Sequence, residues 1–283
     1  AAAGVPAPAA EATWLVEQAN GYQGAERETG LDLAPTVRTL AAFDAMVARR
    51  VDGEPLQYVL GSWAFRHLDL HVDRRVLIPR PETEVVAGVA IDELRRAAVG
   101  RPDRRVVAVD LGTGSGAIGL SLAVEVPEVE VWLTDRSPVA LEVATANLAG
   151  VGRAGARVRV VEGSWYEPLP AELAGRVDVV VSNPPYVADH EELPAEVSEW
   201  EPRSALFAGP TGLEAVGAVV ADAPRWLGDG GSLVVEIAPH QAEAAVALAR
   251  SRFESVEVLD DLAGRPRVLR ARRGVGAGLS WRR

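Results

Sequence analysis

The sequence lacks cysteine and lysine altogether and contains few histidines. Without cysteine, the chain can form no disulfide framework, no thiolate metal site and no cysteine nucleophile. All 29 basic residues are arginine, which, with abundant Ala, Gly and Val, indicates a GC-rich coding sequence rather than a special chemistry. The four histidines do not have the HxxxH spacing or a similar one, so we expect no metal centre; they are His67, His71, His190 and His240.

Long hydrophobic runs are also missing, because no apolar stretch approaches the length of a membrane span. The first residues show no charged segment followed by a long apolar one, which argues against a signal peptide. We therefore expect a cytoplasmic protein without a membrane partner. Apolar residues make up 48% of the 283 positions, so the chain can bury a sizeable core in one large domain plus a small one.

Positive charge is scarce outside the C-terminal end. The formal net charge is -11, yet the segment from Arg265 to Arg283 contains seven arginines and no acidic residue. The remainder therefore carries a charge of about -18. A broad basic face for nucleic acid is not evident, and we expect no stable nucleic-acid partner, although the basic end leaves room for a local one.

Three regions differ in their residue patterns. Residues 1–54 have helical periodicity, mainly between 12 and 52, which predicts a small helical domain. Residues 55–80 contain nearly alternating apolar positions, with a further short run at 76–78, which predicts a β-hairpin or ribbon that links two domains. Residues 81–283 form the third region. Its first helix is expected to run from Pro81 through about Ala98, where Arg95-Arg96 and Gly100 close it.

The third region alternates between strand and helix patterns. We expect strands at 106–110, 129–134, 158–162, 177–182 and 232–237, with helices at 118–126, 138–148, 213–227 and 241–250. This alternation predicts an α/β fold with a mostly parallel sheet covered by helices on both faces. Strands at 256–259 and 267–271 are joined by a short loop, so we expect an antiparallel C-terminal hairpin at the edge.

A glycine-rich loop, Asp110-Leu111-Gly112-Thr113-Gly114-Ser115-Gly116, lies between a predicted strand and a predicted helix. Its glycines permit a tight turn and a close approach of a ligand to the backbone. Asp135 ends the next strand, nineteen residues after Gly116, at the offset where a carboxylate meets ribose hydroxyls in Rossmann-like folds. Asp135 could instead cap the following helix, but the joint occurrence favours an adenosine-type ligand.

Two further side chains could contact that ligand. Asp110 could bind an ammonium group or a water near an amino-acid tail of the ligand. Trp165 follows the third strand and could cover an adenine face, although a packed core tryptophan is nearly as consistent with its position.

Asn183-Pro184-Pro185-Tyr186 follows the apolar strand at 177–182. It places rigid polar groups at the carboxyl edge of the sheet, where ligands bind in open α/β folds. The next 26 residues or so lack periodicity, and loops of that length are usually functional or disordered, so we expect a loop that covers the substrate.

Together, the glycine loop, Asp135, Trp165 and the Asn-Pro-Pro-Tyr segment resemble the Rossmann-like S-adenosylmethionine-dependent methyltransferases. Members that end strand four in Asn/Asp-Pro-Pro-aromatic methylate a planar nitrogen. The resemblance implies S-adenosyl-L-methionine as the cofactor and S-adenosyl-L-homocysteine as the product. The implied cofactor contacts are Gly112, Thr113, Gly114, Ser115, Gly116, Asp135, Trp165 and Asn183.

The residues around these motifs narrow the family. Pro55-Leu56-Gln57-Tyr58-Val59-Leu60-Gly61 and Ile78-Pro79-Arg80-Pro81-Glu82-Thr83-Glu84 are similar to the protein-(glutamine-N5) methyltransferases. Glu201-Pro202, Ala205-Leu206, Gly212-Leu213 and Ala263-Gly264-Arg265 match the same family, so the resemblance covers about Pro55 to Arg272. The family implies methyl transfer to the side-chain nitrogen of the glutamine in the Gly-Gly-Gln motif of peptide chain release factors.

The same resemblance implies roles for individual residues. Asn183, Pro184 and Tyr186 are the implied catalytic residues, and Asn183, Pro184, Pro185 and Tyr186 hold the substrate amide. Residues 1–54 would contact the release factor, and residues 81–283 would form the methyltransferase domain. Two departures from the family are visible: the helices before Pro55 match loosely, and Ser164 stands where many relatives carry Asp, which is a stronger acceptor for an adenine amine.

Three alternatives remain open at this point. A sister enzyme that methylates a glutamine of a ribosomal protein would share every catalytic residue. An enzyme that methylates amino groups of nucleic-acid bases would need a basic substrate surface. A nucleotide-binding adaptor without catalysis would bind cofactor but transfer no methyl group.

Overall fold

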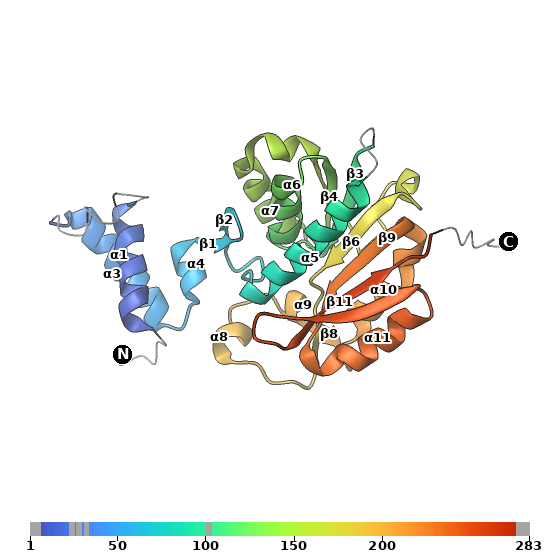
Figure 1. The fold of residues 1–283 in the computed structure, drawn as a ribbon. Helices are drawn as coiled ribbons and strands as arrows, with labels where there is room; N and C mark the ends of the chain where they lie inside the picture. The colour runs from blue at the N-terminus through green and yellow to red at the C-terminus, as the bar shows by residue number, and fades with distance from the viewer. Residues whose placement is uncertain (1–6, 23–25, 27–29, 31–33, 100–103, 276–283) are drawn as a thin grey trace.

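The computed structural model places a small helical group beside a larger α/β body (Figure 1). It describes residues 7–22, 26, 30, 34–99 and 104–275. The position of Gly100, expected to end a helix, and the end of the arginine-rich segment, Arg282 and Arg283, lie outside the described residues. No helix in the described part of the chain is both long enough and apolar enough to cross a membrane.

The N-terminal group consists of α1 (Pro8–Asn20), α3 (Val37–Val51) and the short α4 (Leu56–Leu60). Thr36 caps α3, because its hydroxyl oxygen accepts a hydrogen bond from the backbone N–H of Thr39 at 3.1 Å. The helices enclose a small core around Leu15, Leu56 and Val59. So small a core buries little apolar area, which explains why this group also packs against its neighbour.

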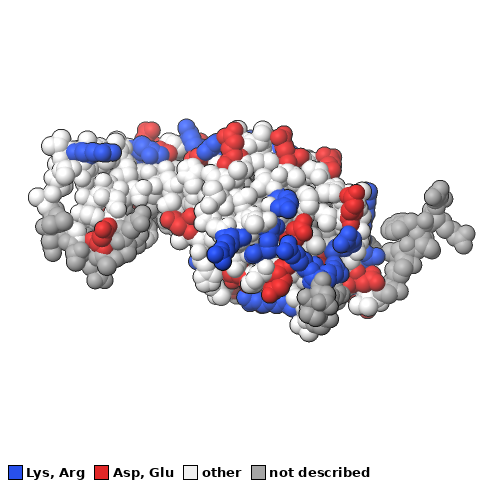
Figure 2. All heavy atoms as spheres, turned by 90° about the horizontal axis from the view of Figure 1, so that it is seen from above, with Lys and Arg blue, Asp and Glu red and all other residues white. Residues whose placement is uncertain are grey.

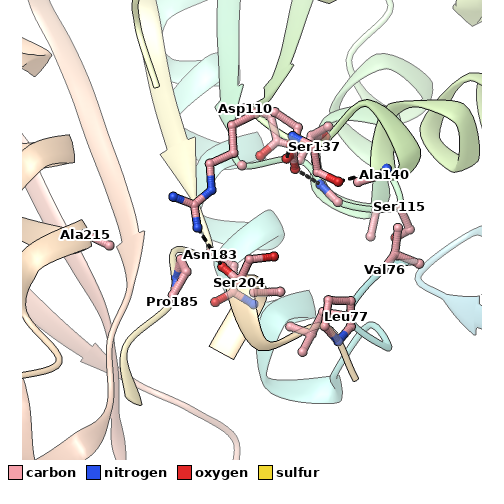
Figure 3. A pocket seen from close by; sticks show the side chains of 18 of the residues that line it. Val76, Leu77, Asp110, Ser115, Ser137, Ala140, Asn183, Pro185, Ser204 and Ala215 are labelled. Atoms are coloured by element: carbon pink, nitrogen blue, oxygen red, sulfur yellow. Dashed lines mark hydrogen bonds between the residues drawn. The ribbon is translucent and has the colours of Figure 1, made fainter. Parts of the chain in front are cut away.

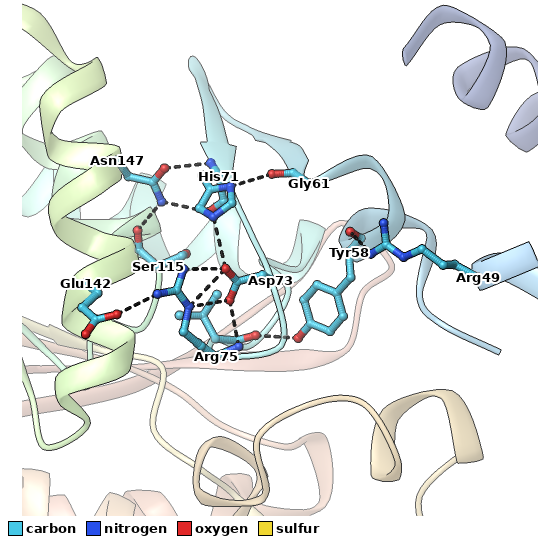
Figure 4. Close-up of polar contacts among 10 residues, drawn as sticks. Arg49, Tyr58, Gly61, His71, Asp73, Arg75, Ser115, Glu142 and Asn147 are labelled. Carbon is cyan, nitrogen blue, oxygen red and sulfur yellow. Dashed lines mark hydrogen bonds and ion pairs between the residues drawn. The ribbon is translucent and has the colours of Figure 1, made fainter. Parts of the chain in front are cut away.

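A two-stranded hairpin, β1 (Ser62–Phe65) and β2 (Leu68–His71), connects this group to the α/β body. Trp63 on β1 meets Trp14 edge to face, with ring centroids 6.0 Å apart. Polar contacts attach the end of β2 to α7 (Pro138–Gly150): Asn147 Oδ1 accepts from the His71 backbone at 2.7 Å (Figure 4). Figure 4 also shows Arg75 joined to Asp73 and to Glu142.

The apolar run at 76–78, which the sequence placed in the predicted hairpin or ribbon, forms no strand in the described structure. A turn precedes this run, because the Val76 N–H donates to the Asp73 carbonyl. The Val76 carbonyl also accepts a hydrogen bond from the Tyr58 hydroxyl. Val76 and Ile78 instead bury their side chains in the main core. Their apolar character reflects this burial rather than strand pairing.

The α/β body is built on a seven-stranded sheet with the order β10-β11-β9-β6-β3-β4-β5. The five parallel strands are β3 (Val106–Leu111), β4 (Val129–Asp135), β5 (Val158–Glu162), β6 (Val177–Ser182) and β9 (Leu227–Glu236). β10 (Ser255–Asp260) and β11 (Pro266–Arg272) form the antiparallel C-terminal hairpin, with β11 paired to β9. The predicted mostly parallel sheet with its antiparallel hairpin is therefore confirmed.

Helices cover both faces of this sheet (Figure 1). On one face, α5 (Pro81–Ala98), α6 (Ala117–Glu125) and α7 share a core with Ala108 of β3. On the other face, α10 (Glu214–Trp226) and α11 (Ala242–Arg250) pack against Val107 and Val109 of the same strand. Because successive strand residues point to opposite faces, a strand buried on both sides is continuously apolar, as the sequence suggested.

The order of the strands creates a crevice at one edge. β3 is followed by α6 on one face of the sheet, whereas β6, its direct neighbour, leads to α10 on the other. Neighbouring strands whose connections leave in opposite directions open a crevice at their carboxyl ends, where ligands bind in such folds. The glycine loop after β3 and Asn183 after β6 both lie at this edge.

Candidate active site

A cavity of about 310 Å³ opens at the carboxyl ends of the parallel strands (Figure 3). Most of the residues that the sequence singled out line it: Gly112, Thr113, Gly114, Ser115, Asp135, Trp165, Asn183 and Pro185, together with Asp110 and Ser164. The structure thus brings together side chains that follow β3, β4, β5 and β6. Gly116, Pro184 and Tyr186 are not among the lining residues, and their roles stay predictions.

The glycine loop is held in a tight turn. The N–H groups of Gly112 and Thr113 both donate to the Thr134 carbonyl, at 2.8 and 2.9 Å. Gly112, Gly114 and Gly116 have φ angles of 69°, 56° and 86°, a left-handed conformation that other residues adopt only with strain. Gly116 is the N-cap of α6, so the first turn of that helix directly follows the glycine loop.

Asp135 is oriented by two backbone groups. Its Oδ2 accepts from the Gly114 N–H and its Oδ1 from the Ser137 N–H, both at 2.9 Å. Ser137, not Asp135, caps α7, because its hydroxyl oxygen accepts from the Ala140 N–H at 3.3 Å. The capping alternative for Asp135 is therefore wrong. Each of its oxygens keeps a second lone pair that can accept a further hydrogen bond from a ligand.

Asp110 lies at the floor of the cavity and is only 1% exposed. Its Oδ2 accepts from the Thr113 hydroxyl at 2.6 Å and from the Gly119 N–H at 2.9 Å. Burial raises the pKa of this carboxyl to about 6, against the lowering effect of both hydrogen bonds. Its Oδ1 is buried and has no hydrogen-bond partner among the described residues, so a donor supplied by a ligand would satisfy it.

Trp165 is half-buried at the cavity wall and has a φ of 47°. A bulky residue in the left-handed region is strained by roughly 1–2 kcal/mol, and such strain concentrates at functional sites. The indole lies against the glycine loop, because a Cβ atom on Gly112 would be 3.5 Å from its Cζ3. The ring thus both lines the cavity and packs on the core, so the two readings of Trp165 are compatible.

Asn183 follows β6 and is half-buried at the cavity wall (Figure 3), where β6 ends beside the start of the glycine loop. β6 ends rigidly there, since the Ser182 hydroxyl donates to the Leu111 carbonyl at 2.7 Å. The Nδ2 of Asn183 donates to the Thr83 hydroxyl oxygen at 3.2 Å. The Thr83 hydroxyl in turn donates to Glu236 Oε2 at 2.7 Å.

A hydrogen bond to its backbone carbonyl holds Tyr186 in place. Its carbonyl accepts from Gln241 Nε2 at 2.9 Å, and the same amide nitrogen donates to the Gly212 carbonyl at 3.1 Å. Burial, and to a lesser degree the Glu236 charge, raises the pKa of the Tyr186 hydroxyl to about 12. The phenol is therefore neutral at physiological pH and is no general base.

The segment between Tyr186 and Leu213 folds over the cavity. It contains β7 (Val187–Ala188), α8 (Ala195–Ser198), α9 (Arg203–Leu206) and β8 (Phe207–Gly209), elements too short to show periodicity. Lining residues from this segment are Pro202, Ser204, Ala205, Phe207 and Ala208. Glu201 anchors it to the start of α5, because its buried carboxylate accepts from the Ile78 N–H and pairs with Arg80.

Three polar residues at or near the cavity were not predicted from the sequence: Thr83, Glu236 and Gln241. Thr83 lies in the Ile78 to Glu84 motif that carries part of the family resemblance, but the motif gave it no role of its own. Glu236 ends a strand just as Asp135 does, so the same reasoning applied to the fifth strand would have found it. Gln241 carried no signal. Among the described residues, no three His, Asp or Glu side chains are grouped so that they could hold a metal ion.

Two family models match the chain. Residues 1–61 match the PrmC N-terminal domain, and residues 94–199 match the methyltransferase small domain. The first match extends the family resemblance to the N-terminal helices, whose sequence by itself resembles the family only loosely.

Curated relatives match over nearly the whole chain. A release factor glutamine methyltransferase of Rhodopirellula baltica is 35% identical over 94% of this chain and 90% of the relative. The enzyme of the same name from Geobacter sulfurreducens is 40% identical over 93% of this chain and 89% of the relative.

A solved structure supports the fold. The 16S rRNA N2 G1207 methyltransferase of T. thermophilus, in complex with AdoMet and guanosine, matches with a TM-score of 0.50 and 19% identity. The match covers 75% of this chain and 49% of that one. At this identity the likeness concerns the fold alone.

Proposed function

This chain belongs to the release factor glutamine methyltransferases, and from that premise we propose that it methylates the side-chain amide nitrogen of the glutamine in the Gly-Gly-Gln motif of peptide chain release factors. The methyl donor would be S-adenosyl-L-methionine. The observation that carries the proposal is a single cavity that joins the glycine loop and Asp135 to Asn183. Such a cavity can hold a methyl donor and a planar amide side by side.

The residues of the cavity fit the donor. The unpartnered Oδ1 of Asp110 is suited to the ammonium group of an amino-acid tail, and Asp135 to ribose hydroxyls. The glycine loop admits a close backbone approach, and Trp165 offers a ring face to the adenine. Gly112, Thr113, Gly114, Ser115, Gly116, Asp135, Trp165 and Asn183 complete the proposed set of cofactor contacts. When bound, the cofactor supplies an electrophilic methyl group on a sulfonium.

The task left to the protein is to orient a poor nucleophile. The lone pair of a glutamine amide is delocalised, so its nitrogen must be placed accurately before the methyl transfer. Asn183 Oδ1 and the Pro184 carbonyl each accept one N–H of the amide, and Tyr186 stacks on its plane. Pro184 and Pro185 lack N–H donors and stiffen the turn. Such pre-orientation is worth on the order of 7–11 kcal/mol, and no strong base is required.

The substrate side of the proposal rests on the N-terminal region and on surface charge. We assign residues 1–54 to recognition of the release factor, 55–80 to the linker and 81–283 to the methyltransferase domain. On the face shown in Figure 2, basic and acidic side chains lie intermixed rather than in one basic field. A protein substrate is consistent with that pattern, whereas nucleic-acid binding favours a clustered basic surface. The cytoplasmic location stays a prediction.

The test is methyl transfer from radiolabelled S-adenosylmethionine to purified release factor, ribosomal proteins and nucleic acid in parallel. We expect label in the release factor, and none when its Gly-Gly-Gln glutamine is replaced by alanine. Label in ribosomal protein or nucleic acid alone would overturn the proposal. Cofactor binding without any label would support the adaptor alternative.

Asn183→Ala tests whether Asn183 acts mainly on the substrate amide or on cofactor binding. We expect transfer to fall by several orders of magnitude while cofactor affinity by calorimetry changes less than about tenfold, since one neutral hydrogen bond is lost. Equal loss of transfer and of cofactor affinity would contradict the amide-holding role.

A further inference from the structure

Three side chains from distant parts of the chain form a hydrogen-bonded row at the cavity, and two of them, Thr83 and Asn183, line it. Glu236 ends β9, Thr83 lies in the first turn of α5, and Asn183 follows β6. Thr83 donates to Glu236 at 2.7 Å, and Asn183 donates to Thr83 at 3.2 Å. Glu236 and Thr83 are 1% and 3% exposed, so solvent does not compete for these bonds.

The direction of these hydrogen bonds follows from the chemistry of the groups. An ionised carboxylate only accepts, so the single proton of the Thr83 hydroxyl goes to Glu236. The Thr83 oxygen is then left as an acceptor toward Asn183 and selects its NH₂ group. Because the two ends of an amide point apart, Asn183 Oδ1 is turned away from Thr83 and is available to accept an N–H from the substrate.

We propose that Thr83 and Glu236 are positioning residues that keep the Asn183 amide in its productive orientation, a role that rests on the proposed function. The opposite orientation presents NH₂ to the substrate NH₂, so two donors face each other. No other described contact of the Asn183 side chain imposes its orientation. The hydrogen bonds from Asn183 to Thr83 and from Thr83 to Glu236 therefore determine whether Asn183 presents an acceptor or a donor to the substrate amide.

The protonation state of Glu236 sets the donor–acceptor direction of the hydrogen bonds from Glu236 through Thr83 to Asn183. Burial raises the pKa of this carboxyl to about 7, against the lowering effects of the Thr83 hydrogen bond and of the Arg267 charge. The charged groups that face Glu236 are Arg267 on β11, Glu82 at the start of α5, and Arg80 just before it. The Tyr186 phenol, which is neutral at this pH, is close enough for the Glu236 charge to raise its pKa.

The expected pH effect follows directly. A protonated Glu236 can donate to Thr83, which frees the Thr83 hydroxyl to donate to Asn183 Oδ1 and allows the amide to turn over. The productive orientation is thus secured above the raised pKa and is lost as pH falls through about 7.

The first experiment measures kcat and KM for methyl transfer to release factor at saturating cofactor, from about pH 6 to about pH 8.5. We expect wild-type kcat to fall toward the acid side. Thr83→Val, which has the same shape without the hydroxyl, should lower kcat about tenfold, the usual size of one hydrogen bond. Thr83→Ser should restore most of that loss, and cofactor affinity should change little in either variant.

Glu236→Gln provides the second variant. Its amide does not titrate in this range, so the acid-side fall in kcat should disappear. Full wild-type kcat in Thr83→Val, or an unchanged acid limb in Glu236→Gln, would overturn the inference. If the wild-type protein transfers no methyl to release factor, the proposed function fails instead, so the two failures are distinguishable.

The second experiment observes the amide directly. The chain has only three asparagines, Asn20, Asn147 and Asn183, so selective ¹⁵N-asparagine labelling yields three side-chain NH₂ pairs. We expect the Asn183 pair to shift with an apparent pKa near 7 in the wild-type protein and not in Glu236→Gln. A merely structural role for Thr83 predicts no titration of this pair, and that result would contradict the inference whatever the activity.

Discussion

The backbone N–H of Gly114 donates a 2.9 Å hydrogen bond to Oδ2 of Asp135. This contact joins the turn after β3 to the end of β4, the neighbouring strand in the sheet. The carboxylate that we assign to ribose hydroxyls therefore also fixes the middle of the glycine loop. A change at either residue should affect both the loop and the ligand.

Asp135→Asn tests that double role. Asn has only one acceptor atom, so either the Gly114 N–H or the Ser137 N–H faces an NH₂ group instead of an oxygen. We expect cofactor affinity by calorimetry to fall by at least about tenfold, because charge-assisted hydrogen bonds are lost. Glu162→Gln, at an exposed carboxylate paired in register with Asp135, serves as the control and should bind cofactor normally.

Cofactor binding should also depend on pH through Asp110. Burial raises its pKa to about 6, and its ionised form is the one that pairs with an ammonium group. Affinity should therefore be full above about pH 7 and fall as pH decreases through about 6, by up to tenfold per pH unit. Calorimetry without protein substrate measures this. Asp110→Asn should bind weakly at every pH, and a persistent acid-side decline in that variant would assign the effect elsewhere.

Gly119→Ala should destabilise the fold. A Cβ atom at this position of α6 would lie 2.1 Å from Leu133 Cδ2 and 3.0 Å from Asp110 Oδ2. Overpacking of this kind costs about 1–3 kcal/mol, which thermal or urea unfolding can measure. Gly217→Ala in α10 is the matched control, since no described atom other than its chain neighbours and the nearby backbone of its own helix lies within 4 Å of its Cβ position. That variant should be neutral or more stable by up to about 1 kcal/mol.

Acid stability should depend on Glu93. This buried carboxylate of α5 accepts from Ser232 and pairs with Arg96, Arg270 and Arg272. Burial opposes its ionisation, but the hydrogen bonds from Arg272, Ser232 and Arg96 outweigh burial and hold its pKa at about 2. Its folded pKa lies below the unfolded value, so its contribution is full above about pH 4.5 and is lost as pH falls through about 2.

Glu93→Gln should therefore lower the free energy of unfolding at pH 7 by about 2–3 kcal/mol, below the usual loss for a fully buried pair because the arginines are partly exposed. The variant should also lose less stability than the wild-type protein on acidification. Glu257→Gln removes a partly exposed partner of Arg270 and should change stability little. Equal effects of the two substitutions would show that burial of Glu93 is unimportant.

The sequence by itself determined the parts of this protein whose signals are local. A strand buried on both faces is continuously apolar, and a turn that requires positive φ requires glycine, so β3, β6 and the Gly112 to Gly116 loop were visible in the chain. Asn183-Pro184-Pro185-Tyr186 was equally legible, because its chemistry lies in four consecutive residues. The fold class and the cavity wall followed from these segments.

Only the tertiary structure decided the contacts between distant residues. Thr83 and Glu236 are 153 positions apart, and nothing in either segment encodes their hydrogen bond. The partners of Asp110, the burial of Val76 and Ile78 in place of a strand, and the folding of residues 187–212 over the cavity likewise depend on packing between elements. Local periodicity determines which face of an element a residue occupies, but packing between distant elements determines which residues it contacts. In this site those contacts set the protonation of Asp110 and Glu236 and the orientation of the Asn183 amide.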